Sequence, residues 1–161
     1  MLTTRNFLVY VGSWSLIGIG AFSLFLIIAG ITKAIQLVRD EDAELRNPMP
    51  LSGWLVLIGY ALTATSFPLI ATYVGLALKS LTPGFWQLFL MNFLIFMMVS
   101  FYDTFIIDIL ILVVWHPDFL NLPDAEAFNS AIYHIKTLIP ATAFSLVFSL
   151  ISSLIAWLII F

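Results

Sequence analysis

Long runs of hydrophobic residues dominate the chain, and only short polar stretches separate them. Four runs reach the length of about 20 residues that an α-helix needs to cross a bilayer. Repeated alternating segments of about ten residues, typical of membrane β-barrels, are not seen in the sequence. The pattern therefore predicts an all-α membrane protein, a four-transmembrane-helix bundle that forms a single domain over residues 1–161. The predicted spans are residues 7–35, 51–78, 85–115 and 137–161.

The polar stretches predict how the spans are connected. The first connection is the most charge-rich part of the chain, and we expect it to prolong the first helix beyond the membrane until Pro48 and Pro50 end it. The second, KSLTPG, is short enough for a tight turn. In the third, Pro123 followed by an acidic residue is typical of a helix start. We therefore predict a short interfacial helix between the third and fourth spans, Asp124–Ile135.

Composition identifies a bilayer as the natural solvent of this chain. Hydrophobic residues make up 62% of it and charged residues 9%, against about 45–50% and about 25% in an ordinary soluble domain. A small domain buries too little of its surface to hide so much apolar area from water. The net charge of −3 argues against a nucleic-acid partner. Because the sequence has no cysteine, it has no disulfide, thiolate metal site or cysteine nucleophile.

The basic residues predict the orientation in the membrane, because cytoplasmic connections carry an excess of Lys and Arg. Four of them fall on the side of the first and third connections, and two fall on the side of the termini. We therefore expect an integral protein of a prokaryotic inner membrane, with the first and third connections in the cytoplasm. The four residues are Lys33, Arg39, Arg46 and Lys136, and the two are Arg5 and Lys79.

Two acidic residues, Asp103 and Asp108, interrupt the third span in the stretch SFYDTFIIDILIL. An ionised aspartate near the bilayer centre costs about 2.5 kcal/mol or more, so each acid needs a partner or a function. In an α-helix, two side chains five residues apart point in directions that differ by about 140°. We therefore predict two polar stripes that face different neighbours. Asn92 and Ser100 lie on the stripe of Asp103, and Thr104 lies on that of Asp108.

Depth and charge predict a partner for Asp108. The first and third helices run in the same direction, so Lys33 lies toward the same interface and could reach inward to pair with Asp108. For Asp103, we expect a polar group from a neighbouring helix near the midplane. Acids at this depth are candidates for a proton or ion site by default, but they also hold helices together. The sequence leaves both roles open.

The third connection supplies two weak candidates for binding a metal or a tetrapyrrole, His116 and His134. Their spacing matches no compact metal motif, so we predict no metal site. The sequence has no nucleophile elbow and no phosphate-binding glycine loop, so we expect no enzymatic activity. The cofactor stays unknown, because surfaces rich in Phe, Leu and Ile suit lipid, another subunit, a pigment or a quinone equally well.

Small residues predict how the helices pack, because association inside a bilayer depends on close contact and on interhelical hydrogen bonds. Pro68 lies at the centre of the second span, where it removes a backbone hydrogen bond and should kink the helix. Such a kink serves bundle packing, and broken helices also line the binding sites of transporters. One face of the fourth span carries small residues at four-residue steps, Ala141, Ser145, Ser149 and Ser153.

Two classes of function fit these features. The first is a non-enzymatic structural or accessory subunit of a membrane complex or homo-oligomer, which the scarcity of catalytic groups and the small-residue face favour. Its partners would be the lipid bilayer, other membrane subunits or further copies of the chain. The alternative is a small transporter or a proton- or cation-conducting protein that uses the intramembrane Asp103 and Asp108.

Overall fold

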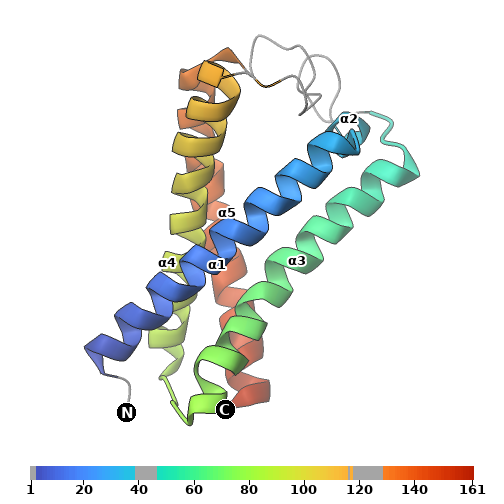
Figure 1. The fold of residues 1–161 in the computed structure, drawn as a ribbon. Coiled ribbons are helices and arrows are strands. Elements are labelled where there is room, and N and C mark those ends of the chain that lie inside the picture. The colour runs from blue at the N-terminus through green and yellow to red at the C-terminus, as the bar shows by residue number, and fades with distance from the viewer. Residues whose placement is uncertain (1–2, 39–46, 116, 118–128) are drawn as a thin grey trace.

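The protein is built from helices. A computed structural model describes residues 3–38, 47–115, 117 and 129–161, and these residues form no strands (Figure 1). Four helical stretches are long and apolar enough to cross a membrane, which confirms the prediction of four apolar spans. They are α1 (Thr4–Ile31), α3 (Leu51–Gly75) followed by η1 (Ala77–Lys79), α4 (Phe85–Tyr102) followed by η2 (Asp103–Trp115), and α5 (Ala131–Ile160).

The four long helices are held together mainly through α4 and α5. α4 packs against both α1 and α5, while α3 packs against α5 and touches α1 only sparsely. Both termini and η1 lie at one end of the molecule, and the short helix α2 (Ala34–Val38) lies at the opposite end (Figure 1). Toward the end that carries α2, α1 and α3 diverge from η2 and α5 (Figure 1).

The densest packing lies at the end that carries the termini and η1. Tyr10 of α1, Ala71 of α3 and Met91 of α4 are buried together in this cluster. Gly75 allows α1 and α3 to approach closely, because a Cβ atom at this position would lie 2.5 Å from Nε1 of Trp14. Side chains from α1, α3, α4 and α5 therefore close this end of the helix assembly.

The first connection departs from the predicted continuous helix. α1 ends at Ile31, and the backbone turns at Lys33, whose φ of 56° lies in the left-handed region that commonly ends helices. The chain then forms the separate helix α2. Residues 39–46, where the prolonged helix was expected, lie outside the described residues. The break at Lys33 cannot be predicted from hydropathy, because helical residues lie on both sides of the turn.

The fourth span begins earlier than predicted. α5 starts at Ala131, and the hydroxyl of Ser130 caps it by accepting a hydrogen bond from the backbone N–H of Tyr133 at 3.4 Å. Residues 131–135, expected at the end of an interfacial helix, are therefore the first turns of the spanning helix. The predicted start of the interfacial helix falls in residues 118–128, outside the described residues.

Candidate intramembrane site

The third span changes its helical geometry at Asp103. Residues 85–102 form an α-helix, whereas Asp103–Trp115 form a π-helix, whose backbone hydrogen bonds join residues five apart. Asp103 and Asp108 are therefore about one turn apart and lie on nearly the same side. The predicted separation of about 140° does not hold here, because it assumed the about 3.6 residues per turn of an α-helix. Asp108 contacts His134 of α5, whereas Asp103 lines a cavity to which all four spanning helices contribute.

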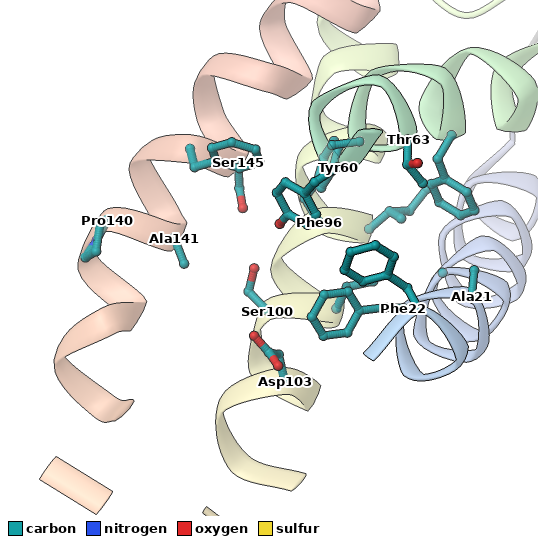
Figure 2. Close-up of a pocket in the computed structure, with 17 residues that line it drawn as sticks. Ala21, Phe22, Tyr60, Thr63, Phe96, Ser100, Asp103, Pro140, Ala141 and Ser145 are labelled. Atoms are coloured by element: carbon teal, nitrogen blue, oxygen red, sulfur yellow. The ribbon is translucent and has the colours of Figure 1, made fainter. Parts of the chain in front are cut away.

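A cavity of about 380 Å³ lies between the four spanning helices, and Asp103 forms part of its wall (Figure 2). Every spanning helix contributes residues to this wall, so the cavity requires all four to be assembled. Most of the wall is apolar. The volume falls in the range of about 300–1,000 Å³ that is typical of sites for small molecules, which are mostly apolar with a few polar groups.

Polar side chains from the second, third and fourth spans face into the cavity (Figure 2). They include Ser100 of α4, Asp103 of η2, Tyr60 of α3 and Ser145 of α5. Ser145 is 1% exposed, and its hydroxyl has no hydrogen-bond partner among the described residues. Asp103 forms no ion pair with a basic side chain in the part of the chain that the structure describes. Among the described residues, the cavity thus presents a carboxyl without an ion-pair partner and a hydroxyl without a hydrogen-bond partner.

Replacing Ser145 with alanine is expected to raise the free energy of unfolding by about 1 kcal/mol, because the variant no longer buries an unbonded hydroxyl. Ser149, four residues further along α5, is as deeply buried and also has no partner among the described residues, but it does not line the cavity. Its alanine variant should gain similar stability. Denaturant titration in mixed micelles measures both variants. A loss of stability in Ser145→Ala alone would show that this hydroxyl is bonded inside the protein.

Asp108 pairs with the imidazole of His134 from α5. Nδ1 of His134 lies 3.1 Å from Oδ2 of Asp108, and the imidazole is almost fully buried. The contact is an ion pair when the imidazole is protonated and a hydrogen bond when it is neutral. Because His134 lies near the start of α5, the pair joins the third and fourth spans near the third connection. It gives one of the two intramembrane acids a partner within the chain.

Sequence reasoning assigned Asp108 a different partner. Lys33 is exposed at the turn between α1 and α2, and its pairing with Asp108 stays a prediction, whereas the contact with His134 is present in the structure. His134 was missed because it precedes the predicted fourth span and was interpreted as part of a connection. The position of the two residues along the membrane normal could have indicated this pair. Consecutive antiparallel spans place the end of one helix, near Asp108, beside the start of the next, near His134.

A buried hydrogen bond continues the polar contact between α4 and α5 toward the other end. Nδ2 of Asn92 donates to Oγ of Ser153 at 2.9 Å, and both side chains are buried. The polar groups of the cavity follow in the middle of the helices, and the Asp108–His134 pair follows near the third connection. The polar positions of the third span therefore contact α5 at two levels and line the cavity between them.

The remaining predicted residues lie at different places in the helices. Thr104 is buried at the start of η2, and Pro68 is buried inside α3 but does not line the cavity. Ala141, from the small-residue face of α5, does line it. Pro140, which sequence reasoning did not consider, lies beside Ala141 in the cavity wall (Figure 2). A proline within α5 was visible in the sequence and was the signal that could have located this wall.

The histidine candidates for metal binding do not form a cluster in the described part of the chain. His134 is engaged with Asp108, and His116 lies outside the described residues. Among the residues that the structure describes, no three His, Asp or Glu side chains are close enough to hold a metal ion.

Comparisons with known proteins do not identify a relative of this chain. No protein-family model, curated protein or solved structure matches this chain. The cavity, the two acids and their surroundings are therefore the features that bear on its function.

Proposed function

We propose that this protein is a small membrane transporter that binds a proton or a cation at Asp103. The observation that carries the proposal is a carboxyl with no ion-pair partner among the described residues, in the wall of a cavity lined by all four spanning helices. An acid at membrane depth is costly unless it is paired or used. A bound proton or cation relieves this cost and its release restores it, so Asp103 is suited to reversible binding.

A carrier fits the packing better than an open pore. On the side of the termini, the cavity borders tightly packed side chains, and Ile95 belongs both to this cluster and to the cavity wall. Leu88 and Met91, which follow toward that end, are fully buried. Passage toward the termini therefore requires a movement of the helices, as in transporters that alternate the access to one site.

The Asp108–His134 pair lies between Asp103 and the third connection. It is one turn of the π-helix away from Asp103, on the side where α1 and α3 diverge from η2 and α5 (Figure 1). An imidazole readily takes up and gives off a proton, and a carboxylate partner orients it. We assign to this pair the exchange of protons between the region of Asp103 and that side of the membrane.

The main feature of the sequence that favoured the alternative, an accessory subunit or a homo-oligomer, is not available for association with another subunit. The small-residue face of α5 was the expected surface for association. Ser145, Ser149 and Ser153 are buried inside the single chain, where Ser153 accepts a hydrogen bond from Asn92 of α4. That face is therefore occupied by the chain's own helices and is not free to bind another subunit.

We place the protein in the inner membrane of a prokaryote, as a four-helix bundle with the first and third connections in the cytoplasm. The excess of basic residues on these connections supports the orientation. The short interfacial helix proposed for the third connection would begin near Asp124 and lead into α5. In this orientation the Asp108–His134 pair faces the cytoplasm, and the densely packed end faces outward.

Replacing Asp103 with asparagine is expected to lower proton or cation flux by about tenfold or more, because the amide keeps the shape of the carboxyl but can neither ionise nor exchange a proton. Flux is measured with the purified protein in liposomes under an imposed pH gradient or cation gradient. The oligomeric state and helix content in detergent should not change. Asp103→Glu, which retains an ionisable carboxyl, should keep part of the flux.

Two outcomes would contradict the proposal. One is the absence of flux above that of empty liposomes in the unaltered protein. The other is equal flux in the unaltered protein and in Asp103→Asn at equal reconstitution. Either result, with normal assembly, would favour the accessory-subunit hypothesis.

A further inference from the structure

Aromatic rings from all four spanning helices line the cavity around Asp103. The ring of Tyr60 lies 6.0 Å from that of Phe25 and 6.2 Å from that of Phe144, centre to centre, so rings of α1, α3 and α5 form a nearly continuous wall. The face of an aromatic ring attracts a cation within about 6 Å of its centre. The lining rings belong to Phe22, Phe25, Tyr60, Phe67, Phe96 and Phe144.

The charge of the cavity wall has one sign. Among the described residues, Asp103 is the only Asp, Glu, Lys or Arg in this wall. It has no ion-pair partner in the described part of the chain, so an ionised Asp103 leaves the cavity negative. A ligand with a positive charge would complete this pairing inside an apolar site.

We infer that the cavity binds a small organic cation, an amine or quaternary ammonium that carries an apolar or aromatic substituent. The charge lies beside Asp103, and the substituent lies among the aromatic rings. The inference rests on the proposed role of Asp103 as a cation site and names the class of ligand. The hydroxyl of Ser145, buried, unpartnered among the described residues and aimed into the cavity, is available to a donor or acceptor group on the ligand (Figure 2).

An organic cation suits the wall better than a metal ion does. Calcium takes about six to eight oxygen ligands, and magnesium keeps several of its waters. The cavity offers a single carboxyl and a few hydroxyls, and the rest of its wall is carbon. An alkylammonium is a large, weakly hydrated ion, and aromatic rings replace its water at little cost.

The space available matches such a ligand. The volume of about 380 Å³ falls at the small end of the range for ligand sites, about 300–1,000 Å³. A second cavity of about 250 Å³ lies between α1 and α3 and shares Phe25 and Thr63 with the first. It extends the site toward α2, where α1 and α3 touch only sparsely, and provides room for an apolar substituent.

Proton and organic cation compete for the same carboxyl in this arrangement. Cation binding should therefore weaken as the pH falls and should release protons. The other titratable groups brought to this region by the described residues are Tyr60 of α3, Asp108 of η2 and His134 of α5. α1 and α4 contribute no ionisable side chain to the cavity wall. Asp108 and His134 contact each other, which leaves Asp103 as the group that the ligand meets.

The test compares benzyltrimethylammonium with neopentylbenzene, a neutral molecule of nearly the same shape. Calorimetric titration of the purified protein in detergent, corrected with empty micelles, measures the two affinities. We expect the protein to bind the cation about tenfold more tightly or better than its neutral counterpart, and to lose this preference in Asp103→Asn. Titrations in buffers of different ionisation enthalpy should show protons released on binding of the cation.

Two phenylalanine variants provide a matched comparison. Phe144→Leu removes a ring from the cavity wall and should weaken cation binding about threefold to tenfold. Phe101→Leu makes the same change at a side chain that is 43% exposed and outside the wall, and it should leave the affinity unchanged. Equal effects of the two variants would overturn the role of the aromatic wall.

Binding and flux separate this inference from the proposed transport function. No cation binding, or equal binding of the cation and neopentylbenzene, overturns the inference, even if Asp103→Asn abolishes proton flux and so supports transport. Cation binding that depends on Asp103, without flux of protons or cations in liposomes, supports the inference and rejects transport. Preferential binding of the neutral molecule would indicate a neutral apolar ligand instead.

Discussion

Replacing His134 with leucine is expected to lower the free energy of unfolding by about 3 kcal/mol, because it removes one partner of a buried polar contact with an acid. The imidazole lies 3.1 Å from the carboxyl of Asp108, which is 17% exposed within an apolar span. Leucine has no polar atom that could replace the lost contact. Denaturant titration of the purified protein in mixed micelles, followed by tryptophan fluorescence, measures the change.

A double variant and a second contact serve as controls. The double variant His134→Leu/Asp108→Leu should be more stable than His134→Leu alone, because the carboxyl that has lost the imidazole is then removed as well. Ser153→Ala removes the neutral hydrogen bond from Asn92 and should cost less, about 0.6–1.7 kcal/mol. If the effects of the two leucine substitutions simply add, the 3.1 Å contact contributes nothing to stability.

Replacing Gly75 with valine is expected to lower the free energy of unfolding by about 1–3 kcal/mol, the usual cost of overpacking a well-packed site. A Cβ atom at Gly75 would lie 2.5 Å from Nε1 of Trp14 and 2.6 Å from Cε2 of Tyr10. Tyr10 is itself buried, so its ring cannot move aside without disturbing the cluster at the terminal end. The same denaturant titration measures the loss.

Gly59→Val is the matched control for this substitution. Gly59 lies on the same helix, and a Cβ atom there would meet nothing within 4 Å. The variant should keep the stability of the unaltered protein. If both valine variants lose the same stability, the close approach of α1 and α3 at Gly75 is not the cause.

Sequence alone determined the helical class and the four apolar spans, although not all of their ends. A span needs about 20 apolar residues, and the sequence of each segment alone decides whether it has them. The third span was accordingly predicted at residues 85–115, the same bounds that the structure gives. The ends that sequence misplaced depend on single residues. The turn at Lys33 separates α2 from α1, and the cap at Ser130 starts α5 before its apolar stretch.

The two acids were found from sequence because charges are rare in apolar spans, but their surroundings were not. The π-helix that brings Asp103 and Asp108 to nearly the same side depends on how the third span packs, and it cannot be read from hydropathy. The cavity and the pairing of Asp108 with His134 depend on the relative depth and rotation of four helices. Tertiary structure decided these features, because each arises where residues of different helices meet, whereas hydropathy describes each helix alone.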